Sequence, residues 1–144
     1  MLKGIPSILS PDLLKVIMEM GHGNELVIGD GNFPSAAWSK KLVRLDGHGI
    51  PEILDALLKF FPLDTFVAHP AVLMDAAGTT PPVWERYRKV VERHEAEAFA
   101  KGFETMERFA FYDRAKEAYA HVATGERALY ANIILKKGVV VETD

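Results

Sequence analysis

The chain has 144 residues, of which 49% are hydrophobic and 26% are charged, and its formal net charge is -3. This balance is typical of a globular protein that is large enough to bury a sizeable core, and the lack of a long Lys/Arg run argues against a nucleic-acid partner. Because the sequence contains no cysteine, disulfides, thiolate metal sites and cysteine nucleophiles are excluded, and a reducing compartment such as the cytoplasm fits this composition.

The first predicted element is an amphipathic helix that begins at Ser10-Pro11-Asp12. Serine is a good N-cap, proline suits the first helical position, and an acidic residue in the first turn favours a helix start. Apolar residues then recur at helical spacing up to Gly21, a residue type that commonly follows a helix end. The predicted apolar face consists of Leu13, Leu14, Ile17, Met18 and Met20.

The segment Gly21-His22-Gly23-Asn24-Glu25 directly after this helix is the strongest functional candidate. The negative end of the helix dipole, together with Glu25 or Asp30, would stabilise a protonated imidazole and make His22 a usable general acid. A simpler alternative is that His22 only caps the last carbonyls of the helix. Glycine on both sides lets the backbone approach a ligand closely and favours the functional interpretation.

Further along, apolar segments of strand length alternate with helical patterns. The run Leu26-Val27-Ile28 predicts a buried strand that ends at Asp30, and a carboxylate at the end of such a strand is well placed to bind a ligand. This alternation predicts an α/β fold in which helices pack on a sheet, and no repeat or linker interrupts a single domain over residues 1-144. The other predicted elements are helices at 51-61, 83-100 and 108-120, a strand at 133-135, and a strand within 67-74 that Pro70 interrupts or confines to a sheet edge.

Two later segments carry polar side chains that could bind a ligand. Arg108 stands beside aromatic residues and can donate several hydrogen bonds, although an ion pair with Glu104 or Glu107 is a simpler alternative. Tyr130 and Asn132 precede the last apolar strand and offer a hydroxyl and an amide. Their simpler alternatives are surface packing for the tyrosine and turn closure for the asparagine.

Known catalytic motifs are missing, including a P-loop, G-x-G-x-x-G, H-E-x-x-H and G-x-S-x-G. The five histidines lack ligand-like spacing, so we do not expect a metal site. Proton transfer needs no redox centre or electrophile, so no cofactor is expected either. No segment is apolar over a membrane-spanning length and no signal peptide is visible, which predicts a cytoplasmic protein. A histidine, an aspartate, an arginine, a tyrosine and an asparagine suit reversible proton transfer on a polyhydroxylated neutral molecule.

With these residues assembled, the chain resembles the sugar mutarotase family that comprises D-ribose pyranase and L-fucose mutarotase, and it is more similar to the fucose branch. Arg108, in the stretch Arg-Phe-Ala-Phe-Tyr, points to L-fucose over D-ribose as the substrate. Residues 66-105 match this family only loosely, and Gly31 and Asn32 depart from its common pattern. The motifs that carry the resemblance are Met20-Gly21-His22-Gly23-Asn24-Glu25, Arg108-Phe109-Ala110-Phe111-Tyr112, Thr124-Gly125-Glu126-Arg127 and Tyr130-Ala131-Asn132-Ile133-Ile134-Leu135-Lys136-Lys137-Gly138, together with Asp30 and Phe33-Pro34.

The resemblance implies a three-layer α/β fold and a homo-oligomer, a decameric ring with active sites between neighbouring subunits. It also implies that His22 donates a proton and that Asp30, Arg108 and the segment Tyr130, Ala131 and Asn132 bind the sugar. Tyr130 is our candidate for the base that takes the anomeric proton, and Asp30 would also keep His22 oriented. The expected reaction is interconversion of the α and β anomers of L-fucose; the alternatives are a D-ribose pyranase or a non-catalytic sugar-binding accessory protein for transport.

Overall fold

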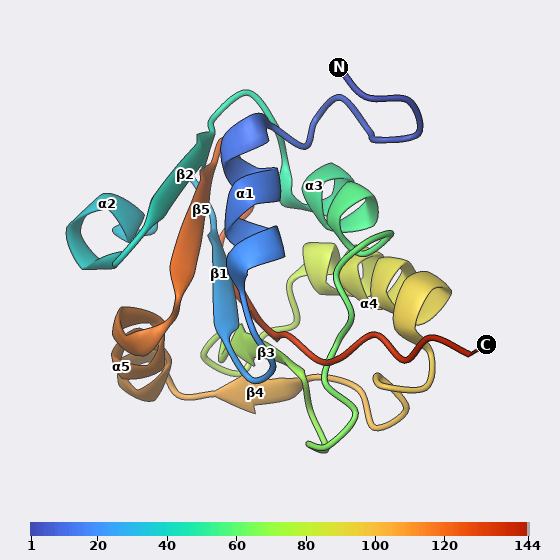
Figure 1. Ribbon diagram of the computed structural model, residues 1–144. Coiled ribbons are helices and arrows are strands. Elements are labelled where there is room, and N and C mark those ends of the chain that lie inside the picture. Colours follow the sequence, from blue (N-terminus) through green and yellow to red (C-terminus); the bar gives the residue numbers. More distant parts are fainter. Residues whose placement is uncertain (144) are drawn as a thin grey trace.

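The computed structural model describes residues 1-143 and is built on one six-stranded mixed sheet (Figure 1). Its strand order is β2-β5-β1-β6-β3-β4. The strands are β1 (Glu25–Gly29), β2 (Leu42–Leu45), β3 (Ala71–Met74), β4 (Glu104–Met106), β5 (Ala120–Thr124) and β6 (Ile133–Lys136). The helices are α1 (Pro11–Glu19), α2 (Ser35–Trp38), α3 (Ile50–Leu57), α4 (Pro82–Glu95) and α5 (Arg108–Glu117).

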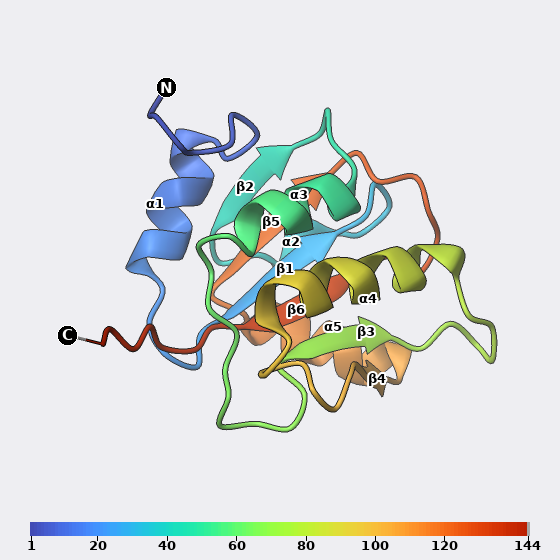
Figure 2. The same ribbon diagram turned by 90° about the vertical axis from the view of Figure 1, so that its right-hand side faces the viewer.

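Helices cover both faces of the sheet. In Figure 1 the sheet is seen nearly edge-on, with α2 and α5 on one side and α1, α3 and α4 on the other, and Figure 2 shows α3 and α4 lying across the second face. Strand residues alternate between the two resulting cores: Leu26 and Ile28 pack with α1, α3 and α4, whereas Val27 packs with Phe111 and Ala115 of α5. The predicted three-layer α/β fold is therefore confirmed.

Strand direction decides which loops meet. Strand β1 is parallel to β5, which is parallel to β2, and β3 is parallel to β4, whereas β6 runs antiparallel to both β1 and β3. Five strands therefore end at one edge of the sheet, here called the carboxyl edge, and β6 begins there. The opposite edge, here called the amino edge, holds the start of β1 and the end of β6.

The predicted N-terminal helix is confirmed in its position and start. The hydroxyl of Ser10 accepts the N–H of Leu13 at 3.2 Å, and Met20 is the C-cap that precedes Gly21. The prediction that Met18 belongs to the buried face is wrong, because this side chain is 84% exposed. Helix α1 lies at the margin of the helical layer (Figure 2), so only the narrower stripe around Leu13 and Ile17 is covered.

Other elements differ from the prediction in position or length. Strand β3 is interior, between β6 and β4, and Pro70 is accommodated because it precedes the strand and its carbonyl accepts the N–H of Lys136 at 2.8 Å. Helices α3, α4 and α5 end before the predicted ends, and the residue expected to close the last of them, Ala120, begins β5 instead. Among the described residues, no helix is both long and apolar enough to cross a membrane.

Candidate active site

A cluster of hydrogen bonds joins Asp30 to a segment about one hundred residues away, at the carboxyl edge. Asp30 follows β1 and is 7% exposed. Its N–H donates to Oδ1 of Asn132 at 2.8 Å, its Oδ1 accepts the N–H of Asn32 at 3.0 Å, and its Oδ2 accepts the N–H of Ala131 at 3.4 Å. Because β6 begins where β1 ends, the fold brings two of the predicted binding segments into direct contact.

The surroundings of Asp30 alter its acidity. Burial raises the pKa of the Asp30 carboxyl above its ordinary value, and the charge of Glu126 acts in the same direction. Hydrogen bonds from the backbone of Asn32, Ala131 and Phe33 oppose this rise without cancelling it. The raised pKa marks a partly desolvated carboxylate that gains from any further hydrogen-bond donor, such as a hydroxyl group.

Tyr130 adopts a strained backbone conformation that helix α4 holds in place. Its φ is 53°, in the left-handed region that bulky residues disfavour. The indole N–H of Trp84 donates to the carbonyl of Tyr130 at 2.9 Å, and the hydroxyl of Tyr87 donates to the carbonyl of Ala131 at 2.8 Å. Sequence reasoning left Trp84 unassigned and did not consider Tyr87. Backbone strain that is fixed by its neighbours is typical of functional segments.

Arg108 begins α5 directly after β4, so it lies at the carboxyl edge as well. Its exposed guanidinium stands over the ring of Phe109, 4.7 Å from the ring centre. The simpler alternative of an ion pair with Glu107 is wrong: that carboxylate caps α5 by accepting the N–H groups of Phe109 and Ala110, each at 3.0 Å. Within residues 1-143, no salt bridge engages Arg108, which leaves its donors facing solvent.

A surface cavity of about 520 Å³ adjoins this cluster. Glu126 lies on its wall and fixes the loop before β6, because its carboxylate accepts the N–H groups of Ile50, Arg127 and Ala128 at 3.1, 2.9 and 3.1 Å. Glu126 belongs to Thr124-Gly125-Glu126-Arg127, one of the motifs that carry the family resemblance, but the sequence alone assigned it no role. The walls include Thr79, Pro82, Arg86, Glu126, Leu129 and Tyr130.

His22 lies in a tight turn at the amino edge. The N–H of Asn24 donates to the carbonyl of Gly21 at 3.1 Å, and Gly23 has a φ of 85°, the left-handed value that a type II turn requires at its third residue. The alternative that His22 caps helix α1 is wrong, because the ammonium group of Lys137 bonds the last carbonyls. The imidazole Nε2 instead lies 3.1 Å from Oδ1 of Asp64, a residue that sequence reasoning did not consider.

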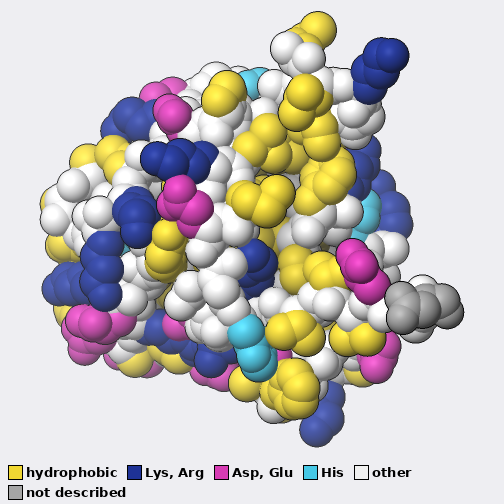
Figure 3. Space-filling model, viewed as in Figure 1, with side chains coloured by type: hydrophobic (Ala, Val, Ile, Leu, Met, Phe, Trp, Pro, Cys, Tyr) yellow, Lys and Arg dark blue, Asp and Glu magenta, His cyan; other side chains and the backbone are white. Residues whose placement is uncertain are grey.

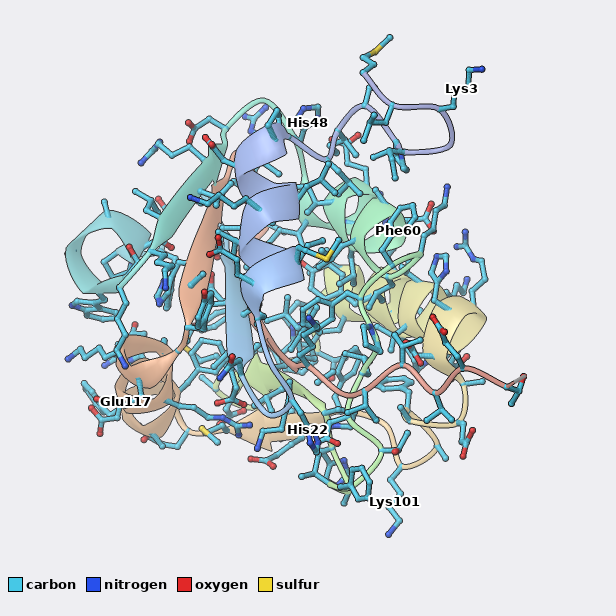
Figure 4. The ribbon with its side chains drawn as sticks, viewed as in Figure 1. Lys3, His22, His48, Phe60, Lys101 and Glu117 are labelled. Carbon is cyan, nitrogen blue, oxygen red and sulfur yellow. The ribbon has the colours of Figure 1, made fainter. Side chains whose placement is uncertain are left out.

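Within one chain, His22 and the Asp30 cluster are far apart. The five residues of β1 separate them, which corresponds to about 16 Å at the rise of an extended strand. Figure 4 shows His22 at one end of the molecule and His48, which follows β2, at the other. The expectation that Asp30 keeps His22 oriented is therefore wrong within one chain, where the imidazole contacts Asp64 instead. Glu25, the other carboxylate expected to stabilise the protonated imidazole, is bonded to Arg114 at 3.0 Å.

Replacing Gly23 with alanine is expected to destabilise the turn that carries His22. A left-handed φ costs an L-residue about 1 kcal/mol, and the added methyl group would meet no atom within 4 Å, so backbone strain alone accounts for the loss. Urea unfolding measures this difference. Gly47→Ala is the matched control, because Gly47 is exposed, has open space and lacks a left-handed φ. An equal change in both variants would contradict the explanation.

In the part of the chain that the structure describes, no three His, Asp or Glu side chains converge as metal ligands. The arrangement consists of a hydrogen-bonded carboxylate and amide, an exposed arginine and a histidine paired with a carboxylate. Chemically it can bind hydroxyl groups and move protons.

Comparison with known proteins gives a consistent result over nearly the full chain. Residues 3-140 match the model of the RbsD / FucU transport protein family. The fucose mutarotase of Bos taurus is 48% identical over 99% of this chain and 97% of its own length. The crystal structure of the fucose mutarotase from Streptococcus pneumoniae, in complex with L-fucose, has a TM-score of 0.91 and 51% identity, covering 97% of this chain and all of that chain.

A more distant structure shows the same fold. The structure of Bacillus subtilis RbsD complexed with D-ribose has a TM-score of 0.73 and covers 98% of this chain and 100% of that one, at 23% identity. At this identity the likeness concerns the arrangement of the sheet and helices alone. The fold is therefore shared across both named branches of the family model.

Proposed function

This chain belongs to the RbsD / FucU transport protein family, and on that premise we propose that it is an L-fucose mutarotase. The reaction is the interconversion of the α and β anomers of the free sugar by acid/base-assisted ring opening and closure. The observation that carries this proposal is the Asp30 cluster at the carboxyl edge, where a buried carboxylate, Asn132 and a strained Tyr130 form a preorganised hydroxyl-binding surface. His22 adds a group that can donate a proton, which the binding of hydroxyl groups alone would not require.

The chemistry needs one acid and one base. Protonated His22 gives its proton to the ring oxygen as the bond between that oxygen and the anomeric carbon breaks, and the electron pair stays on the oxygen. The anomeric hydroxyl gives its proton to the phenolate oxygen of Tyr130, directly or through a water, and becomes the aldehyde oxygen. After rotation of the open chain, ring closure on the other face returns both protons, so that no cofactor is required.

The remaining residues would bind the sugar. The Asp30 carboxylate accepts hydrogen bonds from sugar hydroxyls, and Arg108 and the Asn132 amide position the others. Ala131 is fully buried and both of its backbone groups are bonded, to Asp30 and to Tyr87, so it would take part by holding the binding segment in place. These contacts keep the acyclic chain near its closing geometry.

We propose that the complete site forms between neighbouring copies of the chain, with His22 of one facing the Asp30 cluster of the other. The separation of about 16 Å along β1 supports this arrangement. A closed homo-oligomeric ring, decameric as the family resemblance implies, would bring opposite edges of two copies together. A cytoplasmic location suits the absence of cysteine.

Exposed apolar side chains on the face that carries α1 support self-association. They lie over the N-terminal segment, α1 and the end of α3 (Figure 3) and border a groove of about 380 Å³ that Lys137 also lines. Exposed apolar patches of this kind are typical of protein interfaces. The residues are Leu2, Met18, Phe60 and Val140, which are 70%, 84%, 43% and 70% exposed.

Exchange NMR at equilibrium tests the function directly. Magnetisation transfer between the anomer signals of L-fucose is followed as protein is added, with D-ribose alongside. Faster exchange for fucose is the expected result. Acceleration for ribose alone would assign the protein to the pyranase branch, and sugar binding without acceleration would indicate an accessory binding protein for transport.

Sugar affinity is expected to fall on acidification because of Asp30. Its raised pKa means that the carboxyl takes up a proton at a higher pH than an ordinary aspartate, and a protonated carboxyl loses one acceptor site for sugar hydroxyls. Affinity should thus be full well above that pKa and decline through it, by about 10- to 100-fold. NMR titration with L-fucose from pH 7 downward measures this effect. Asp30→Asn should bind weakly at every pH, and a similar decline in that variant would contradict the assignment.

A further inference from the structure

We propose that Asp64 is the positioning residue for His22: it holds Nε2–H of the imidazole and leaves Nδ1 as the nitrogen that gives the proton to the sugar ring oxygen. This inference rests on the proposed function and deepens it. His22 would act as the acid through Nδ1, and the sequence pattern did not indicate Asp64.

The Asp64 carboxylate is fixed independently of His22. Asp64 is 3% exposed, its Oδ1 accepts the N–H of Phe66 at 3.0 Å, and its own N–H donates to the carbonyl of Lys136 at 3.0 Å. Oδ1 also lies 3.1 Å from Nε2 of His22. A carboxylate that its surroundings already hold in place can orient a ring that would otherwise turn freely.

The charge state of Asp64 decides which nitrogen carries the proton. Burial acts to raise the pKa of this carboxyl, but hydrogen bonds from Phe66 and His22 and the charges of His22 and Lys136 together hold the pKa below its ordinary value. An ionised carboxylate only accepts hydrogen bonds, so Nε2 must carry the hydrogen that faces it. In neutral His22 the lone pair is then on Nδ1, and in the cation Nδ1 carries the exchangeable proton.

The side chain of His22 is partly exposed to solvent. The side chain of His22 is 45% exposed, against 5% for that of Asp64, so the pair extends from the interior to the surface. Within residues 1-143, Asp64 is the only side chain hydrogen-bonded to the ring of His22. The ring of Phe66, itself 76% exposed, lies 5.3 Å from the imidazole and forms an apolar wall beside it.

Backbone hydrogen bonds tie the two partners to a common support, the segment Lys136 to Gly138. The N–H of Gly23 donates to the carbonyl of Lys137 at 2.8 Å, and the N–H of Gly138 donates to the carbonyl of Pro62 at 2.8 Å. The contact at Gly138 is close: a side chain there would come within 2.5 Å of the carbonyl oxygen of Leu63. The segment therefore holds the His22 turn and Asp64 side by side.

The chain contains a matched histidine and carboxylate pair away from this site. Nε2 of His94 in α4 lies 2.7 Å from Oδ1 of Asp55 in α3, and the hydrogen bond from His94 is the main cause that lowers the pKa of Asp55. This pair has similar chemistry but joins two helices. Its removal controls for the general effect of losing a carboxylate partner.

The test compares Asp64→Asn with Asp55→Asn in fucose exchange NMR and by 15N NMR of the imidazoles. In Asp64→Asn, kcat is expected to fall about 10- to 100-fold, while KM changes little because the sugar contacts remain. The wild-type spectrum should show His22 protonated at Nε2 when neutral. Asparagine can pair with either tautomer, so this preference should be lost in Asp64→Asn and kept in Asp55→Asn, which should retain full activity.

Several results would overturn the inference. One is unchanged kcat in a folded Asp64→Asn, and another is an equal loss in Asp55→Asn. Neutral wild-type His22 protonated at Nδ1 would also overturn it, and this measurement needs no variant, so it stands if Asp64→Asn does not fold. A wild-type protein that shows the Nε2–H tautomer but accelerates no sugar would contradict the proposed function and leave the role of Asp64 in orienting the ring supported.

Discussion

Replacing His22 with asparagine is expected to slow anomer exchange of L-fucose by about 10²- to 10⁴-fold, the contribution of one positioned acid or base. Asparagine keeps a polar side chain in the turn but cannot deliver a proton to the ring oxygen. Sugar affinity should change little, because the groups proposed to bind the sugar hydroxyls belong to the Asp30 cluster at the other edge of the sheet. Exchange NMR measures the rate, and a titration with L-fucose measures the affinity.

A second histidine provides the control for this variant. His94→Asn removes an imidazole that is also paired with an aspartate, at 2.7 Å, but lies between α3 and α4. It should exchange fucose anomers at the wild-type rate. A His22→Asn protein that assembles normally and retains full activity would rule out His22 as the acid and favour catalysis by the Asp30 cluster alone.

Co-assembly of two inactive variants is expected to restore activity. His22→Asn chains keep the Asp30 cluster, and Asp30→Asn chains keep His22, so a site between unlike neighbours can combine two intact halves. With equal amounts and random mixing in a closed ring, about a quarter of the sites should be complete. The measurement is fucose exchange by mixed oligomers produced by co-expression of two differently tagged chains and purified through both tags.

The control for co-assembly combines both changes in one chain. Mixed oligomers of His22→Asn with the double variant His22→Asn/Asp30→Asn contain no intact His22, so no site can be complete and exchange should stay at the level of the single variants. Absence of recovery in assembled oligomers that contain both single variants would contradict a shared site. A dissociated wild-type monomer should likewise be inactive.

Sequence patterns predicted β1, β6 and the start of α1, and missed β2, β4 and β5. The apolar runs of β1 and β6 and the capped start of α1 carry strong local signals. Strands β2 and β4 have only four and three residues, too few for a clear pattern. All five residues of β5 are buried, but its Ala-His-Val-Ala-Thr composition has a weak strand preference, and only helices on both faces of the sheet account for its burial.

The candidate site was predictable one segment at a time, but not as an arrangement. His22, Asp30 and the segment from Tyr130 to Asn132 each stood out by local chemistry. The predicted strand between the first two already implied their separation, since extended residues cannot fold back on themselves. Asp64 gave no signal, because it lies 42 residues from His22 and its place depends on backbone pairing with Lys136.

Strand β6 has a consequence for how this protein can change. Ile133, the first residue of β6, follows the segment from Tyr130 to Asn132 that contacts Asp30. Lys136, its last residue, begins the segment from Lys136 to Gly138 that supports the His22 turn. Four residues thus set the spacing between two surfaces that, in the proposed oligomer, would each contact a neighbouring copy. An insertion of one residue into β6 would turn the side chains beyond it to the opposite face of the sheet and would shift the two surfaces relative to each other. Variation in sugar preference is therefore expected to come from the loops at the sheet edges, while the length of this strand stays fixed.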